Sequence, residues 1–198
     1  MKLRPAILLL LLVSCLSPGG TANSSPDSVV RDLYKQAVAR KPLGIPKGAD
    51  RAALSAFLSK GLLRRLDEAQ ACEDDYLRQH GNEGGKPAFV WLETGIFSGS
   101  NERGLPAAAV VERTQRQEDG SSYVYVRLTY KESSETYGKP PNPANTFHWH
   151  VAAVVISESG KFFINDVLFF KDNSNTIESR LSDSFPGCDG SRWVGDKR

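Results

Sequence analysis

The chain after Ser25 places apolar side chains on one face of a helix. Pro26 suits the first turn of a helix because its missing N–H would have no partner there, and Ser25 can serve as the cap. Apolar residues then recur every three or four positions: Val29, Val30, Leu33, Tyr34, Ala37 and Val38. The pattern predicts an amphipathic helix of about four turns, ended by the Pro- and Gly-containing stretch 41–49.

Two further helices are predicted before residue 81. Asp50 can cap a helix whose inward-facing residues are Leu54, Phe57 and Leu58. Gly61 can interrupt the helical run, and a longer helix then follows from Leu62 to His80, where Gly81 stops it. The first half of the chain is therefore predicted to be helical.

Beyond residue 106 the apolar pattern changes to the period of two that is typical of strands. Four segments follow this pattern: 107–118, 121–131, 146–157 and 161–170. Gly120 and the Glu-Ser-Gly stretch 158–160 are hairpin signals, so consecutive strands should run antiparallel. We interpret 88–105 as an irregular covering loop and 132–145 as a long loop at one rim. Helices followed by a meandering sheet predict an α+β domain with N-terminal helices on a mainly antiparallel four-stranded sheet.

The first thirteen residues have the pattern of an export signal. Lys2 and Arg4 precede the apolar run 6–13, whose eight residues rise about 12 Å as a helix, too little to cross about 30 Å of hydrocarbon. The stretch Leu12-Val13-Ser14-Cys15 resembles the bacterial lipobox, in which the cysteine is lipidated and becomes the new N-terminus. The alternative is ordinary cleavage after Ala22.

These signals divide the chain into a signal peptide at 1–14, a flexible tether at 15–25 and one domain at 26–198. Leu16 and Ser17, directly after Cys15, do not supply the acidic residue that retains lipoproteins at the inner membrane, which favours the periplasmic face of the outer membrane, or the cell surface, in a Gram-negative host. Cleavage after Ala22 would instead give a soluble secreted protein. The lipid on Cys15 makes the membrane the first expected partner.

The composition is that of an ordinary globular chain of 198 residues, with 40% hydrophobic and 24% charged residues, and its length suits one domain. The formal charge of +2 gives no electrostatic argument for nucleic acid as a partner. Loss of Lys2 and Arg4 with the signal leaves as many basic as acidic residues. The mature chain is therefore formally neutral.

The three cysteines predict one disulfide. Lipidation or excision removes Cys15, and the remaining pair, Cys72 and Cys188, lies in an oxidising compartment. A catalytic thiol is the alternative, but the acidic residues 73–75 would raise the pKa of the Cys72 thiol and lower its reactivity. A Cys72–Cys188 bridge is the prediction.

The two strands from Trp149 to Phe170 carry a resemblance. They read Trp-x-Val-Ala-x-Val-Val and then Gly-Lys-Phe-Phe-Ile-Asn-Asp-Val. With the preceding helices, this resembles the nuclear transport factor 2-like superfamily, which has a cystatin-like, cone-shaped α+β fold, and most of all its bacterial exported proteins and lipoproteins of uncharacterised function. The resemblance implies a curved sheet bent round the helices to form a pocket. Members include isomerases, dehydratases, polyketide cyclases and non-enzymatic modules, so it implies no single activity.

Asp166 is the strongest candidate for chemistry. A carboxylate among aromatic and aliphatic strand neighbours needs either a partner or a raised pKa, and acid–base enzymes use the latter. The resemblance implies a catalytic Asp/His pair, here Asp166 with His148 or His150. The alternative is structural: Asp166 accepts hydrogen bonds from backbone groups or from Arg127.

Alternation puts His148 and His150 on one face of a strand, where two imidazoles could share a metal if Glu93 or Asp166 supplied a third ligand. We expect no metal, because the only other histidine, His80, is far away in sequence and Cys72 and Cys188 are expected to be oxidised. We expect no cofactor either, and the glycines at 95, 99 and 104 lack the Gly-Lys-Ser/Thr ending of a phosphate loop. The aromatic side chains of this region indicate a pocket for an apolar ligand instead. Its candidate lining residues are Trp91, Glu93, Phe97, Tyr125 and Trp149.

Three functions remain open at this point. A non-catalytic module would bind a small apolar ligand or a protein partner in an open cavity. An isomerase or dehydratase would need Asp166 and a histidine to converge in an enclosed pocket. An inhibitor or immunity-like protein would need a filled cone and an exposed patch, most naturally on the loops 95–104 or 132–145.

Overall fold

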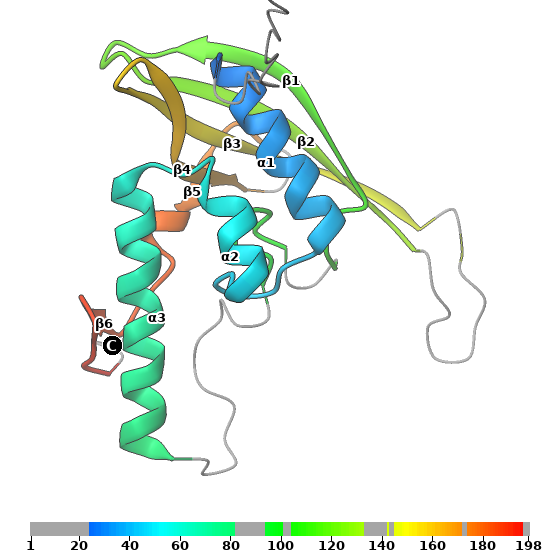
Figure 1. Ribbon diagram of the computed structural model, residues 1–198. Coiled ribbons are helices and arrows are strands. Elements are labelled where there is room, and N and C mark those ends of the chain that lie inside the picture. Colours follow the sequence, from blue (N-terminus) through cyan, green and yellow to red (C-terminus); the bar gives the residue numbers. More distant parts are fainter. Residues whose placement is uncertain are drawn as a thin grey trace, which may run out of the picture.

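The computed structural model describes residues 24–81, 94–100, 104–132, 142, 145–171 and 174–195 (Figure 1). Residues 1–23, with the expected signal peptide and Cys15, lie outside the described residues, as do Trp91, Glu93 and most of the connection 132–145. Within the described residues the chain forms three helices, then five strands of one sheet, then a short hairpin. The α+β prediction is confirmed.

Helix α1 (Pro26–Arg40) forms as its pattern predicts. The Ser25 side chain accepts a hydrogen bond from the Ser28 N–H, and the Ser28 side chain accepts one from the Ser25 N–H, so the two residues make a reciprocal cap. The apolar face is buried against the sheet: Val29, Val30, Leu33, Tyr34 and Ala37.

Helices α2 (Gly48–Ser55) and α3 (Lys60–His80) begin at other residues than expected. Asp50 lies inside the first turn of α2 and accepts a hydrogen bond from Arg40, so the prediction that it caps the helix is wrong. The break before α3 falls at 56–59 and not at Gly61. Ser59 supplies the cap of α3, because its hydroxyl accepts from the Leu62 N–H while its own N–H donates to the Ile164 carbonyl.

The sheet has five strands where four were predicted. Its strands pair in the order β1-β2-β3-β4-β5, and every neighbouring pair is antiparallel. They are β1 (Ala108–Arg116), β2 (Ser122–Lys131), β3 (Thr146–Glu158), β4 (Lys161–Phe170) and β5 (Ile177–Arg180). The unexpected β5 is only four residues long and its first three are exposed, so it has no apolar alternation by which to recognise it.

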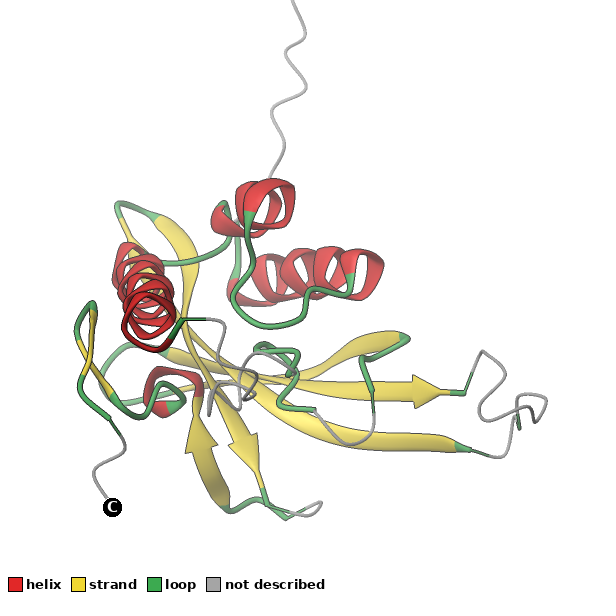
Figure 2. Cartoon of the chain, turned by 90° about the horizontal axis from the view of Figure 1, so that it is seen from below, coloured by secondary structure: helices red, strands yellow, loops and turns green. Residues whose placement is uncertain are grey.

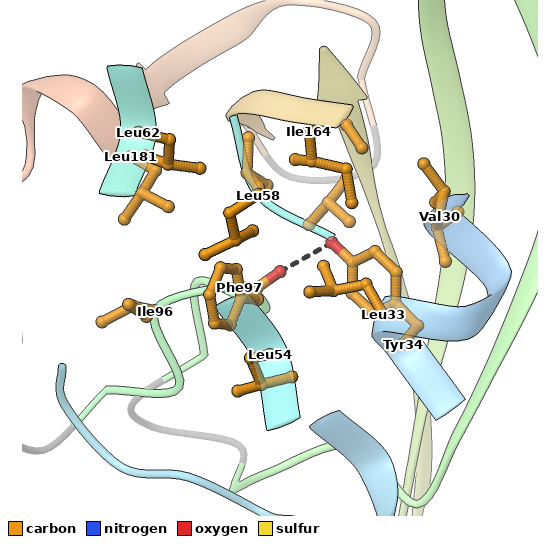
Figure 3. Packing of buried hydrophobic residues seen from close by; sticks show 14 of the residues in the cluster. Val30, Leu33, Tyr34, Leu54, Leu58, Leu62, Ile96, Phe97, Ile164 and Leu181 are labelled. Atoms are coloured by element: carbon orange, nitrogen blue, oxygen red, sulfur yellow. Dashed lines mark hydrogen bonds between the residues drawn. The ribbon is translucent and has the colours of Figure 1, made fainter. Parts of the chain in front are cut away.

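All three helices lie on the same side of the sheet, and the main core fills the space between them (Figure 2). Residues 94–100, expected to be a covering loop, instead contribute to this core. Phe97 is only 3% exposed, and its carbonyl accepts a hydrogen bond of 2.8 Å from the Tyr34 hydroxyl (Figure 3). Burial raises the pKa of the Tyr34 phenol far above its usual range.

The opposite face of the sheet carries a smaller apolar cluster of its own. Ala152, Val154 and Leu168 are buried there beneath partly buried aromatic side chains. Tyr125 stacks on Phe170, with ring centroids 5.9 Å apart. This second cluster has no helix over it among the described residues.

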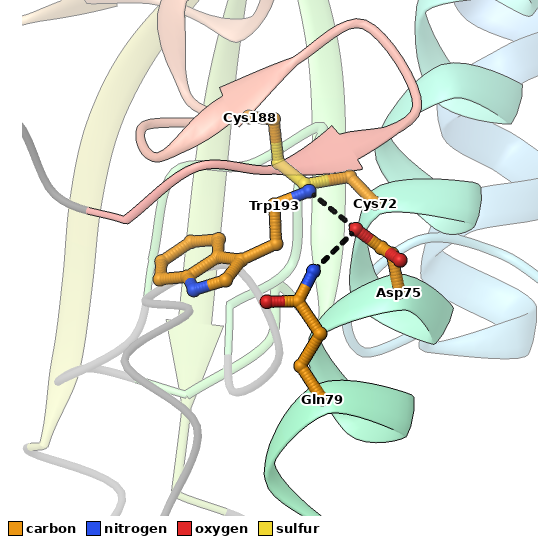
Figure 4. The surroundings of a disulfide bond; sticks show 5 residues. All are labelled: Cys72, Asp75, Gln79, Cys188 and Trp193. Atoms are coloured by element: carbon orange, nitrogen blue, oxygen red, sulfur yellow. Dashed lines mark hydrogen bonds between the residues drawn. A yellow bond between two sulfur atoms is a disulfide. The ribbon is translucent and has the colours of Figure 1, made fainter.

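The predicted disulfide between Cys72 and Cys188 is present (Figure 4). It joins α3 to β6 (Cys188–Asp189), which pairs with β7 (Arg192–Trp193) in a separate two-stranded hairpin. The Trp193 N–H also donates a 2.9 Å hydrogen bond to the Asp75 carboxylate on α3. The C-terminal hairpin is therefore held on the side of α3. None of the helices in the described residues has the length and apolar character needed to cross a membrane.

Candidate functional site

A pocket of about 380 Å³ opens on the helix-bearing side of the sheet. It lies between β3, β4 and β5, the segment 94–99 and the chain that follows β5. Its apolar wall consists of side chains from four of these regions: Ile96, Trp149, Val151, Phe169 and Leu181. The volume falls within the range of roughly 300–1,000 Å³ that is usual for small-molecule sites.

Two local contacts fix the aromatic part of this wall. Trp149 faces inward from β3, and its indole N–H donates a 2.9 Å hydrogen bond to the Ser98 carbonyl. Gly99 has a φ of +64°, and a Cβ there would lie 2.5 Å from Cδ1 of Phe169. Only glycine allows this close approach without displacing the ring or straining the backbone. The indole and phenyl rings are thus positioned before any ligand arrives.

The mouth of the pocket is polar and carries negative charge. Glu178, Ser179 and Asp183 are exposed lining residues, and no Lys or Arg belongs to the lining that the structure describes. His150 also reaches the lining, but its Nε2 lies 3.2 Å from the Glu112 carboxylate. The site combines an apolar interior with acidic groups at its entrance, which favours neutral or cationic ligands over anions.

Asp166 is buried, 6% exposed, and both oxygens of its carboxylate accept hydrogen bonds. Oδ1 accepts from the Val167 and Ser182 N–H groups at 2.9 and 3.0 Å, and Oδ2 accepts from the Ser182 hydroxyl at 2.7 Å. The predicted backbone partners are confirmed. Arg127 is not a partner, because it donates to Glu112 at 2.7 Å instead. Asp166 holds the turn η2 (Leu181–Asp183) against β4.

The strand register separates Asp166 from the histidines. Asp166 lies opposite Val154, whereas His150 lies four residues earlier on β3, about 13 Å away at the usual rise per residue. His148 contacts the Thr129 hydroxyl through Nδ1 at 3.0 Å. Asp166 is not among the lining residues of the pocket. The convergence that an acid–base pair requires is therefore not found between these residues.

Of the five expected lining residues, Trp149 lines the pocket and two lie elsewhere. Phe97 is in the main core, and Tyr125 is on the opposite face of the sheet, where the Arg113 guanidinium lies 3.5 Å above its ring. Trp91 and Glu93 lie outside the described residues. Among the residues that the structure does describe, no three metal-ligating side chains are gathered together.

Sequence reasoning missed most of the pocket. Phe169 could have been found, because alternation along β4 gives it the same inward direction as Val167. Leu181, Glu178 and Asp183 belong to the short strand β5 and the turn after it, which carry no periodic signal. Comparison with known proteins adds nothing to this site: no protein-family model, curated protein or solved structure matches the chain.

Proposed function

We propose that this protein is an exported, non-catalytic binding module, anchored to a membrane by a lipid on Cys15, whose pocket takes up a small ligand with an aromatic or aliphatic body. The observation that carries the proposal is the open pocket with Trp149 and Phe169 in its wall. Small-molecule sites typically combine such an apolar interior with a few polar groups. The two carboxylates at the mouth favour a neutral or cationic ligand.

The fold supports the finer proposal of a nuclear transport factor 2-like cone. Helices on one face of an antiparallel sheet, with a pocket on that same face, are compatible with it. Among the functions open to that superfamily, ligand binding agrees best with the geometry. An acid–base enzyme would need Asp166 free to exchange a proton, and an inhibitor would be expected to have a filled interior.

Binding can be tested with prodan, a neutral naphthalene dye that brightens in apolar surroundings. We expect saturable binding of one dye per chain, accompanied by a change in tryptophan fluorescence. The anionic dye 1-anilinonaphthalene-8-sulfonate should bind more weakly, because Glu178 and Asp183 repel it at the mouth.

Two exposed serines provide a test variant at the pocket mouth and a matched control away from it. Ser179→Trp places an indole at the pocket mouth and should weaken prodan binding by roughly tenfold or more. Ser157→Trp, on an exposed part of β3 outside the lining, should leave it unchanged. Absence of saturable binding, or equal binding by both variants, would count against the proposed pocket.

A further inference from the structure

A second cavity, of about 290 Å³, lies between α3, the first turn of α2 and the connection from α1 to α2. Figure 1 shows this connection running from the blue α1 to the cyan α2. The cavity shares no lining residue with the pocket that contains Trp149. Its lining combines apolar residues of 42–46 with three charged residues, Lys47, Asp50 and Glu73.

Glu73 places a buried carboxylate in this cavity. Its side chain is only 7% exposed, and Oε1 accepts a hydrogen bond from Lys47 Nζ at 3.0 Å. Oε2 has no hydrogen-bond partner in the part of the chain that the structure describes. A carboxylate can accept about four hydrogen bonds. Burying a carboxylate costs free energy unless its oxygens are hydrogen-bonded. Glu73 therefore has unused capacity to bind a cation.

Lys47 is a partner that can be displaced. Its side chain is 59% exposed, so its ammonium group can turn into water when another cation takes its place. Ion pairs with so exposed a partner contribute little to stability, and the long side chain regains rotamer freedom when it is released. Asp50 is 38% exposed and occupied by Arg40 at 3.1 Å, which leaves Glu73 as the principal acceptor.

The walls beside Glu73 suit an aliphatic stem. Pro42, Ile45 and Pro46 are buried lining residues, while Leu43 is 58% exposed at the edge. The Gly44 N–H donates a 2.9 Å hydrogen bond to the Thr94 carbonyl, which fixes the connection in place. A rigid wall lowers the entropy lost on binding.

We propose that this cavity binds an alkylguanidinium group, which displaces Lys47 and donates to both oxygens of Glu73. A planar guanidinium matches a carboxylate in a two-pronged contact, and it would use the Oε2 acceptor that Lys47 leaves unused. Its stem would lie against the apolar residues 42–46. A free alkylguanidine and an arginine side chain of a peptide share this chemistry. The site is independent of the proposed function of the other pocket.

The test is isothermal titration calorimetry of the full chain with butylguanidinium and, separately, with N-acetyl-arginine N-methylamide. Saturable binding of either probe is expected. The ratio of the two affinities distinguishes a free alkylguanidine from an arginine side chain of a peptide. Butylurea, which has a similar shape without the charge, should not bind. Lys47→Ala removes the competing ammonium and should tighten binding about tenfold.

Glu73→Gln keeps the size of the side chain and should weaken binding at least tenfold. The matched controls are Glu68→Gln on the same helix and Lys161→Ala on β4, both of which should bind as the wild type does. Circular dichroism melting verifies that each variant folds. The proposal is overturned if neither probe binds the wild type or Lys47→Ala, or if the Glu73 and Lys47 variants bind like their controls.

Discussion

At the residue scale, the hydrogen bonds of Asp166 matter more than its burial. Burying a polar group costs free energy unless it is hydrogen-bonded, and the Asp166 carboxylate accepts three hydrogen bonds. Two of these donors belong to Ser182, sixteen residues further along the chain. Asp166 is thus a structural link between β4 and the turn that borders the pocket, and its role should be visible as stability.

Replacing Asp166 by alanine should lower the free energy of unfolding by roughly 2–4 kcal/mol, because charged hydrogen bonds are lost and the Ser182 donors lose their acceptor. Urea unfolding measures this change. Asp183→Ala removes an exposed carboxylate from the same turn and should change stability by less than about 0.5 kcal/mol. Equal effects of the two variants would contradict the structural role of Asp166.

Tyr34 gives a prediction about pH. Burial raises the pKa of its phenol in the folded state above the unfolded value of about 10. Its contribution is therefore fully present below pH 10 and is lost above it, at about 1.4 kcal/mol per pH unit. Tyr34→Phe loses the hydrogen bond to the Phe97 carbonyl, which contributes about 1 kcal/mol at neutral pH. Because phenylalanine does not ionise, the variant also escapes the loss of stability above pH 10.

Urea unfolding of both proteins between pH 8 and pH 11 measures the effect. The stability difference between wild type and Tyr34→Phe should shrink above pH 10. Other titrating groups cancel in this comparison because both proteins share them. A constant difference over the whole range would show that Tyr34 ionises as easily in the folded chain as in the unfolded one.

At the element scale, sequence predicted what depends on periodicity and failed where tertiary contacts decide. Helix α1 and strands β2 to β4 have strong apolar patterns, and they form where expected, as does the more exposed β1. Helix α2 begins at Gly48 without a side-chain cap, and β5 is defined by pairing with β4, as at Leu168 and Arg180. The pocket is the feature that sequence predicts least well, because β5 and the turn after it supply Leu181 and the residues at the pocket mouth.

The Cys72–Cys188 bridge leads to a prediction for the C-terminal hairpin. The cysteines are 116 residues apart, and loop-closure entropy sets an upper limit of about 4.9 kcal/mol on the stabilisation. Reduction should therefore lower the free energy of unfolding by about 2–4 kcal/mol. It should also release β6 and β7 selectively, since the hydrogen bond from Trp193 to Asp75 is a weaker link to α3.

Hydrogen exchange resolves the local part of this effect. The amides of Trp193 and Val194, whose hydrogen bonds hold the hairpin, should exchange much faster after reduction, whereas those of β2 and β3 should change little. Uniform acceleration across the sheet would mean that the disulfide stabilises the whole domain and not this hairpin.

At the scale of the whole molecule, both cavities depend on the same pair of connections. The segment 94–99 closes the pocket that contains Trp149, and through the Gly44–Thr94 hydrogen bond it also fixes the wall of the cavity that contains Glu73. Gly44 and Gly95 form a bridge between the two connections. The walls of both cavities therefore share one hydrogen-bonded pair of connections.

We propose that a lipid on Cys15 attaches the protein to a membrane, and replacement of Cys15 tests this proposal. In a Gram-negative host the wild type should fractionate with membranes and have the mass of a chain that begins at a lipidated Cys15. Two acyl chains are needed for stable anchoring, since each buried CH₂ contributes only about 0.8 kcal/mol.

Cys15→Ala retains the small residues before Asn23, so it should be cleaved after Ala22 and appear in the soluble fraction. Ser17→Ala is the matched control and should stay with the membranes. Recovery of soluble, unmodified wild-type protein would refute lipidation and leave the secreted form.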